Sequence, residues 1–343
     1  PNELSTLNNL AVSLAETGRF AAALEPLHEA YRLRASSPEV RGTALFLEAS
    51  LGDVLRCVGE FRESLAWLDR ARPVIAEHAP GFMVGVHNQQ ALTWLHLGQH
   101  ARAYRELQDA LAIDGAPPAF QAKTHLLLAR YAMALAQQSG VGGGVGGGGG
   151  GGGVGDAGSS GLGGSGGAAA RKALGAARAL SSSSARYATH AQAELLAARF
   201  DEPEAAYRAA TAVVLEAGSR QMQGVRMAGL GCAARSALAC GHTAVAVGHA
   251  IEALALWPEH VPDDFYVGEV WLAAATCLDA AHDPRLAGVL EHAIGWIGST
   301  ARDHVPEEFR DSFLNRNAAN RELIAMAVRH RIERAAPLPI GPP

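Results

Sequence analysis

An apolar pattern with helical spacing returns about every 40 residues along this chain, and it constrains the fold more than any other feature. In its first copy, Leu7, Leu10 and Leu14 fall on one stripe of an α-helix. Gly18 follows at a turn, and a second apolar stripe begins at Ala23. One such helix pair cannot cover its own apolar faces. The pattern therefore predicts helix pairs that stack on their neighbours.

The pattern of the first copy is similar to a known helical repeat. Its residues are Leu7, Leu10, Ala11, Leu14, Gly18, Ala23, Leu27 and Ala30. They resemble the tetratricopeptide repeat, with leucine in place of the usual first aromatic residue. Later copies keep the spacing at Leu51, Gly59 and Leu68; Ala91, Gly98 and Leu107; Ala193 and Ala205; Leu230, Gly241 and Ala250; and Val270 and Leu290. The resemblance implies an all-α fold, a right-handed α-solenoid of about seven tetratricopeptide-like helix pairs with a C-terminal helical cap.

A run rich in glycine interrupts the fourth copy at residues 140–167. The first helix of this copy is predicted over residues 123–138, and the second resumes after the run with Ala170 and Leu174. Glycine has no side chain to bury and loses the most backbone freedom on ordering, so the run is predicted to be a disordered insertion in the turn of this pair. A flexible linker between two separate solenoids is the alternative.

The remaining composition agrees with a single solenoid over residues 1–334 and a flexible Pro-rich tail over residues 335–343. The 343 residues are 48% hydrophobic, which suffices for a continuous core. The net charge is −5 and no Lys/Arg cluster stands out, so no direct contact with nucleic acid is expected. The absence of a long apolar run and of a signal peptide predicts a cytoplasmic protein that makes no membrane contact. Because the chain begins at Pro1, we expect it to be a piece of a longer protein.

Residues that commonly bind metals do not form a standard motif. The cysteines show no CxxC spacing and are predicted to be small buried residues: Cys57, Cys232, Cys240 and Cys277. His96 and His100 have the spacing of a helical metal pair, but Gly98 between them lies at a predicted turn and breaks the shared face. His242 and His249 are predicted to be surface or packing residues. The sequence therefore predicts no metal site.

Sequence motifs of enzymes are also missing. The glycine run satisfies a GxGxxG search, yet no strand precedes it, and the chain has no P-loop, HExxH or GxSxG motif. The acidic neighbours Asp263 and Asp264, like Glu307 and Glu308, stand at predicted loops or helix starts. There they are expected to interact with the positive end of a helix dipole. The sequence predicts neither an enzyme nor a cofactor.

Binding is the remaining class of function, and the resemblance implies where it occurs. In the tetratricopeptide family the first helix of each pair lines a concave groove, and two template positions face the ligand. Those positions here carry Asn8, Asp53, Asn88, Arg130, His190, Glu194, Arg235 and Trp271. This mostly polar set suits a protein, a peptide or a neighbouring domain of the same parent protein, with ordinary groove surface as the alternative. Chaperone-binding members clamp a terminal carboxylate, but Val12 and Ala49 occupy two places where that clamp needs polar side chains.

The C-terminal region carries a second resemblance. Its residues are Val305, Pro306, Glu307, Glu308, Phe309, Arg310, Asp311, Ser312, Phe313 and Leu314, then Asn317, Asn320, Arg321, Glu322 and Leu323. They are similar to the segment that closes the repeat arrays of large bacterial regulators, including LuxR- and BTAD-type proteins with a nucleotide-binding switch. The apolar face of this segment is expected to seal the open end of the stack. The resemblance implies the sensor or interaction arm of a transcription-regulatory or signalling protein; a free-standing adaptor is the alternative, and an enzyme a more distant one.

Overall fold

The computed structural model describes residues 2–36, 45–139, 165–181 and 187–332, and the regular structure within them is helical. The α-helices are α1 (Asn2–Glu16), α2 (Phe20–Ser36), α3 (Leu47–Val58), α4 (Phe61–His78), α5 (Met83–His96), α6 (His100–Leu111), α7 (Pro118–Ser139), α8 (Ser165–Ser181), α9 (Tyr187–Ala197), α10 (Pro203–Ser219), α11 (Gln223–Ala239), α12 (Thr243–Ala255), α13 (Val267–Ala280), α14 (Leu286–Asp303), α15 (Arg310–Asn315) and α16 (Ala318–Arg329). Short 3₁₀ helices are η2 (Pro80–Phe82), η4 (Ala198–Phe200) and η5 (Glu307–Phe309). None of the helices in this part of the chain is long and apolar enough to cross a membrane.

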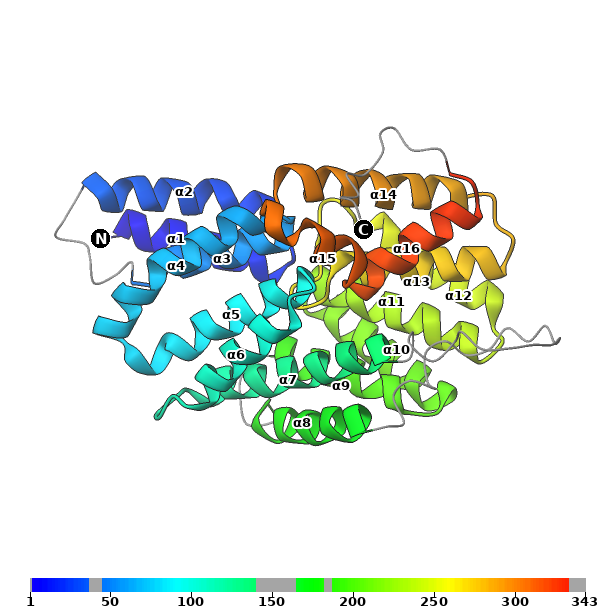
Figure 1. The fold of residues 1–343 in the computed structure, drawn as a ribbon, viewed down its shortest axis with the longest axis horizontal. Coiled ribbons are helices and arrows are strands. Elements are labelled where there is room, and N and C mark those ends of the chain that lie inside the picture. Colours follow the sequence, from blue (N-terminus) through cyan, green and yellow to red (C-terminus); the bar gives the residue numbers. More distant parts are fainter. Residues whose placement is uncertain (1, 37–44, 140–164, 182–186, 333–343) are drawn as a thin grey trace.

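Successive helices pack as pairs, from α1 with α2 to α13 with α14, and α15 and α16 follow the last pair (Figure 1). Each pair also packs on the next one, as α2 does on α3 and α4 on α5. The arrangement confirms the predicted all-α solenoid. It follows directly from the repeated apolar stripes, because each stripe can leave water only against another helix.

The turn between the two helices of a pair depends on glycine. In the second pair, Gly59 ends α3 in the left-handed conformation, with a φ of 91°. Its backbone N–H donates to the carbonyl of Arg56, and the next N–H donates to the carbonyl of Leu55. These bonds satisfy the last carbonyls of α3, and only glycine adopts this conformation without a Cβ penalty. Gly18 and Gly98 have the same conformation in the first and third pairs.

The fourth pair is the one that the glycine run interrupts. Ala132 and Met133 of α7 pack in one apolar cluster with Ala170 and Leu174 of α8. The two helices therefore form a pair across residues 140–164, which lie outside the described residues, as does the predicted tail over residues 335–343. Helix α8 already begins at Ser165, so the last three residues of the run are helical.

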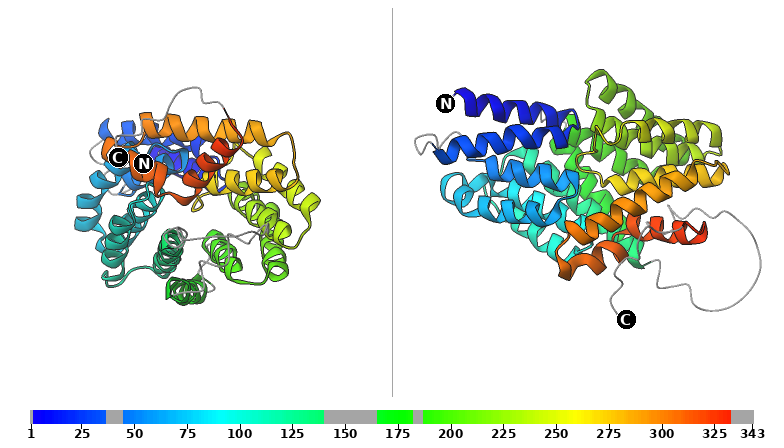
Figure 2. Two further views of the ribbon diagram at one scale, coloured as in Figure 1. Left: turned by 45° about the vertical axis from the view of Figure 1, so that its right-hand side comes forward. Right: turned by 90° about the horizontal axis from the view of Figure 1, so that it is seen from above.

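The C-terminal half turns back onto the first three pairs. The two views of Figure 2 show α14 alongside the first pairs. A Cβ placed on Gly18 would lie 2.7 Å from the backbone nitrogen of Gly224, and one on Gly59 would lie 2.7 Å from the Trp296 ring. The backbone N–H of Arg62, at the start of α4, donates to the carbonyl of His304 over 2.8 Å. The glycine turns are therefore docking points as well as helix ends.

The third turn docks against α15. Ser312 Oγ donates to the carbonyl of Leu97 over 2.7 Å, and Asn317 Nδ2 donates to the carbonyl of His96 over 2.8 Å. The Phe313 ring lies 5.7 Å from the ring of Phe61, measured between centroids. The C-terminal cap therefore does more than cover the last pair: it joins the end of the solenoid to the second and third pairs.

Candidate binding surface

The inner side of the solenoid is crossed by residues 256–266, the non-helical connection between α12 and α13, here called the inner segment. In Figure 1 it is the yellow chain between the cyan and green helices. Just before its two aspartates, the backbone N–H of Val261 donates to the carbonyl of Gly18 over 2.9 Å, and His260 Nδ1 lies 3.1 Å from the carbonyl of Thr17. The segment thus enters the fold at the first turn.

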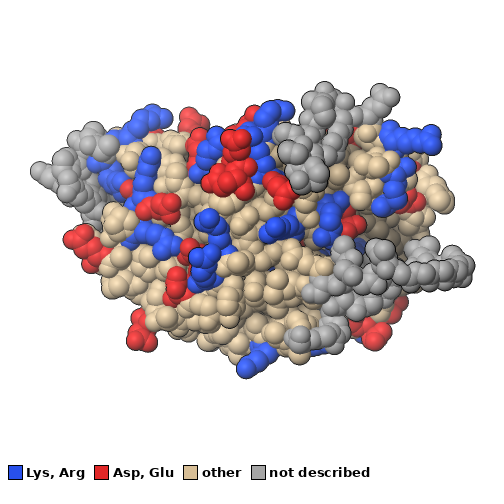
Figure 3. All heavy atoms as spheres, in the orientation of Figure 1, with Lys and Arg blue, Asp and Glu red and all other residues tan. Residues whose placement is uncertain are grey.

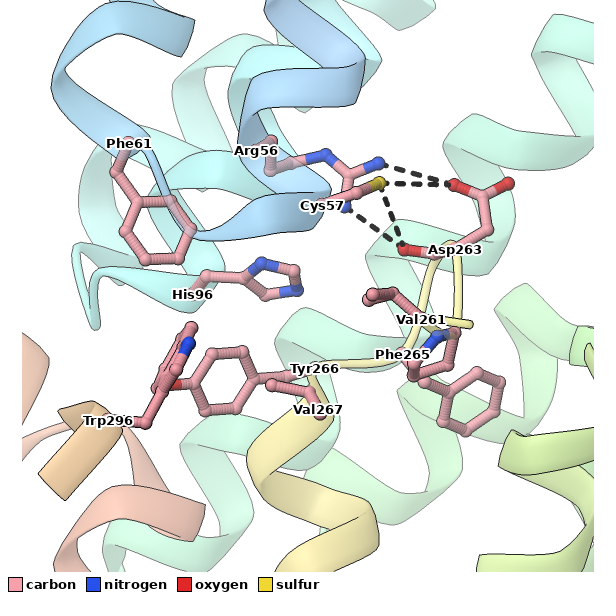
Figure 4. A pocket seen from close by; sticks show the side chains of 11 residues that line it. Arg56, Cys57, Phe61, His96, Val261, Asp263, Phe265, Tyr266, Val267 and Trp296 are labelled. Carbon is pink, nitrogen blue, oxygen red and sulfur yellow. Dashed lines mark hydrogen bonds and ion pairs between the residues drawn. The ribbon is translucent and has the colours of Figure 1, made fainter. Parts of the chain in front are cut away.

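Arg56 of α3 holds the middle of the inner segment (Figure 4). One guanidinium nitrogen lies 3.3 Å from Oδ1 of Asp263, and another donates to the Asp263 carbonyl over 3.1 Å. The same guanidinium contacts Asp53, one helical turn earlier, at 2.7 Å. Burial opposes the charge of Arg56, but the surrounding groups, including Asp53 and Asp263, raise its pKa well above the ordinary value. Arg56 is therefore a buried, permanently charged anchor for the segment.

A second ion pair fixes the next residue. Lys123 Nζ of α7 lies 2.7 Å from Oδ1 of Asp264, whose side chain is only 2% exposed. Burial favours the neutral acid, but the charges of Lys123 and Arg56 outweigh it and lower the pKa of Asp264. Asp263 behaves oppositely: burial and the Asp264 charge raise its pKa to about 6. The two neighbouring carboxylates therefore differ in how readily they take up a proton, and Asp264 keeps its charge to lower pH than Asp263 does.

A third group of charges lies at the start of α13. Glu269 is 3.1 Å from a guanidinium nitrogen of Arg130 and 3.5 Å from one of Arg199. The Arg130 guanidinium also lies 4.3 Å from the ring centroid of Phe265, in the inner segment. Burial favours the neutral acid, but these arginines lower the pKa of Glu269. Acidic groups of the inner segment and α13 thus meet basic groups on the first helices of several pairs.

The positions expected from the repeat template lie in three environments. Asp53 and Arg130 belong to the charge network, and Arg235 lies within 3.8 Å of the Cys232 sulfur, where burial lowers its pKa. Asn88 and Trp271 are each 1% exposed. Half-buried positions are Asn8, His190 and Glu194.

The two buried positions have internal partners. Asn88 Nδ2 donates to the carbonyl of Phe120 over 2.9 Å, and the hydroxyl of Thr124 donates to Asn88 Oδ1 over 2.9 Å. Trp271 packs edge-on against Trp257 and Trp296, with ring centroids 5.1 and 5.2 Å away. Glu194, by contrast, forms an ion pair at 2.7 Å with Arg178 of the preceding pair.

The repeat template does not include Arg56 or Lys123, and Asp263 and Asp264, expected at a loop or a helix start, lie in a loop. A signal existed: Arg56 follows Asp53 by one turn of α3, and Lys123 precedes Arg130 by two turns of α7, so each shares a face with a template position. What the pattern could not supply was the partner, because the inner segment comes from a distant part of the chain.

A small cavity of about 10 Å³, large enough for about one water molecule, lies beside this network. Its walls include Arg56, His96, Tyr266 and Trp296 (Figure 4). Neither ring nitrogen of His96 has a hydrogen-bond partner among the described residues. Burial, followed by the charges of Arg56 and Arg130, lowers the pKa of His96 well below its ordinary value. His96 is therefore neutral in the folded protein.

Replacing His96 with phenylalanine is expected to make stability less sensitive to acid. Unfolded His96 regains a pKa near 6.5 and binds a proton below that pH, whereas folded His96 does not, so its contribution to stability is present above pH 6.5 and is lost as the pH falls. The free energy of unfolding of the variant, relative to that of the wild type, should rise by about 1–2 kcal/mol between pH 8 and about pH 5. Urea unfolding at both pH values measures it. An advantage that is the same at both pH values would contradict a neutral His96.

One face of the molecule shows no comparable concentration of charge. On the face shown in Figure 3, basic and acidic side chains are interspersed, and a broad stretch over α6 and α7 carries few of either. The rings of Tyr104 of α6 and Tyr131 of α7 stack with centroids 5.0 Å apart, and Tyr104 is 41% exposed. The opposing charges around the inner segment, by contrast, lie side by side in the interior.

Comparison with protein-family models agrees with the repeat assigned to the first helix pair. A family model described as "Tetratricopeptide repeat" matches residues 4–36, which form the first helix pair. A solved tetratricopeptide repeat protein from Parabacteroides merdae is similar at 13% identity and a TM-score of 0.40, over 92% of this chain and 99% of that one. No curated protein matches the chain. The first helix pair of this all-α solenoid thus matches a tetratricopeptide repeat, a type of repeat that supports a role as a protein-interaction scaffold.

Proposed function

We propose that this chain is a protein-recognition scaffold whose inner surface binds an extended acidic segment. One observation carries the proposal: the chain's own inner segment lies there without helical structure and is held through Asp263 and Asp264 by Arg56 and Lys123. A surface that pairs buried cations with an extended acidic strand is chemically suited to a second strand of the same kind. The partner is thus a protein, or a neighbouring domain, with acidic residues in an extended stretch.

Binding in this proposal is an exchange. The inner segment is covalently attached and occupies its site at a high effective concentration, so an external segment gains access only to the fraction of molecules in which the site is open. Any change that loosens the inner segment should therefore raise the apparent affinity for an external one. The template position Arg130 would contact the external segment, and Asp53 would hold the Arg56 guanidinium in place for it. The half-buried Asn8, His190 and Glu194 would extend the contact surface along the solenoid.

Exchange would also change the closure of the solenoid. The hydroxyl of Tyr266, the last residue of the inner segment, donates to Oδ1 of Asn320 in α16 over 2.9 Å. When an external segment displaces the inner segment, this bond breaks and the C-terminal helices lose a contact. The two states, with and without the bond, are what a sensor requires. On this basis, and on the resemblance of residues 305–323, the chain acts as the interaction arm of a bacterial transcription-regulatory or signalling protein in the cytoplasm.

Peptide binding tests the proposal. The probe is a fluorescent peptide with the sequence of residues 258–266, and the protein is compared with the double variant H260A/V261A, which removes contacts near the first turn. Circular dichroism and thermal unfolding establish that both are folded. Fluorescence anisotropy should show at least about tenfold tighter binding to the variant, because its site is open more often.

A second peptide serves as the control. It carries asparagine in place of both aspartates and should bind at least about tenfold more weakly, since it cannot form the ion pairs with Arg56 and Lys123. Equal binding of the two peptides, or binding of neither to the loosened variant, would contradict recognition of an acidic segment by this surface.

A further inference from the structure

The turn between α11 and α12 differs from the docked turns of the first three pairs. Gly241 in this turn has a φ of 80°, the left-handed conformation, and a Cβ placed on it meets nothing within 4 Å. The turn is therefore open, whereas the turns at Gly18, Gly59 and Gly98 are covered by the C-terminal half. Its two flanking residues are Cys240 and His242.

These two residues meet a third from another helix pair. Glu204 lies in the first turn of α10. A carboxylate oxygen of Glu204, the sulfur of Cys240 and a ring nitrogen of His242 all lie within 4.8 Å of one another. Glu204 and His242 are exposed and Cys240 is half-buried, so the three side chains can adjust around a shared ion. Cys240 differs here from the other cysteines, which are buried as the sequence predicts: Cys57, Cys232 and Cys277.

Thiolate, imidazole and carboxylate are the ligands that zinc takes in proteins, at about 2.3, 2.0–2.1 and 2.0–2.2 Å. Tetrahedral geometry at those lengths places ligand atoms about 3.5 Å apart. The spacing of Glu204, Cys240 and His242 therefore needs a contraction of at most about 1.3 Å, within reach of rotamer changes in side chains that are open to solvent.

Charge distinguishes this cluster from two others that bring together histidine, cysteine or acidic side chains. In the group of Asp53, Cys57 and Asp263, the Arg56 guanidinium already supplies the positive charge. In the group of His87, Glu106 and Asp109, Arg72 lies 2.6 Å from Glu106.

The third cluster has no such cation. Among the described residues, Glu204 takes part in no ion pair with a basic side chain. Partial burial, then the charge of Glu204 and its hydrogen bond with Cys240, raise the pKa of the Cys240 thiol. A divalent cation would reverse that effect, because a metal-bound thiol is deprotonated.

We propose that Glu204, Cys240 and His242 form a zinc site, with the fourth position open to solvent. No standard sequence motif marks this site, because Cys240 and His242 are only two residues apart and Glu204 comes from a different helix pair. A bound ion would join the start of α10 to the turn between α11 and α12, two elements of neighbouring pairs. It would also protect the Cys240 thiol from oxidation.

Cobalt(II) is the first probe, because it reports ligand type and geometry through its absorbance. The metal-free, reduced protein should bind one Co²⁺ with the visible bands of a tetrahedral ion and a thiolate-to-cobalt charge-transfer band, and added Zn²⁺ should remove both. Zn²⁺ should also slow modification of Cys240 by a thiol reagent. A six-coordinate spectrum without a thiolate band would overturn the proposal.

Single variants then assign the ligands. C240S should abolish the thiolate band. H242Q and E204Q should each weaken Zn²⁺ binding by more than about 100-fold, the upper range for loss of an outer-shell partner. The matched control is E202Q, which removes an exposed carboxylate two residues from Glu204 and should leave binding unchanged. All four positions are at least partly exposed, so circular dichroism should show unchanged folding. Zn²⁺ binding that is insensitive to C240S, or equally sensitive to E202Q and E204Q, would also overturn the proposed zinc site.

Discussion

Replacing Lys123 with methionine is expected to lower the free energy of unfolding by about 3–5 kcal/mol, the cost of leaving a buried charge without its partner. Lys123 Nζ lies 2.7 Å from Asp264, and both side chains are largely covered. Methionine keeps the apolar stem but removes the ammonium, so Asp264 must either stay ionised without its counterion or take up a proton. Urea unfolding at neutral pH, followed by circular dichroism, measures the loss.

Two controls separate the ion pair from a general effect of removing lysine. K172M changes an exposed lysine on α8 and should alter stability by no more than about 0.5 kcal/mol. The double variant K123M/D264L replaces the pair with apolar side chains and should recover most of the stability, because such replacements are often neutral. A loss below about 1 kcal/mol in K123M would show that Asp264 has no need of Lys123.

The local architecture could be predicted because its causes are local. The stripe of Leu7, Leu10 and Leu14 predicts helix α1, although Leu10 is 49% exposed and the buried residues of this helix are Leu4 and Ala11. Gly59 ends α3 through bonds to carbonyls of its own last turn. The interrupted fourth pair follows the same rule, since the apolar faces of α7 and α8 retain their complementarity on either side of the glycine run.

The candidate site could not be predicted to the same extent, because it depends on curvature. Whether the solenoid stays open or returns to its first pairs is the sum of small rotations between pairs, and no single motif encodes that sum. Template position alone therefore placed Trp271 in a groove, whereas the returning C-terminal half surrounds it with Trp257 and Trp296. The same return gives Asp263 a partner in Arg56, which no short-range pattern could indicate.

Closure itself can be tested at one turn. Replacing Gly98 with alanine is expected to cost about 2–5 kcal/mol, the sum of about 1–2 for a left-handed residue with a Cβ and about 1–3 for overpacking. Gly98 has a φ of 70°, and its new Cβ would collide with the carbonyl of Ser312, lie 2.9 Å from the Cβ of Arg316 and lie 3.1 Å from the nitrogen of Asn317. Backbone atoms of α15 must move to relieve those contacts.

Gly241 supplies the matched control, because its turn has the same left-handed conformation and nothing within 4 Å of a new Cβ. G241A should therefore show only the conformational cost of about 1–2 kcal/mol. Urea unfolding of the two variants isolates the docking contribution as their difference. If the two variants lose equal stability, α15 does not pack against the third turn in solution. If G98A loses more, and hydrogen exchange rises in α15 and α16 while α11 and α12 stay protected, the first three pairs hold the C-terminal helices in place, as the exchange mechanism at the inner surface requires.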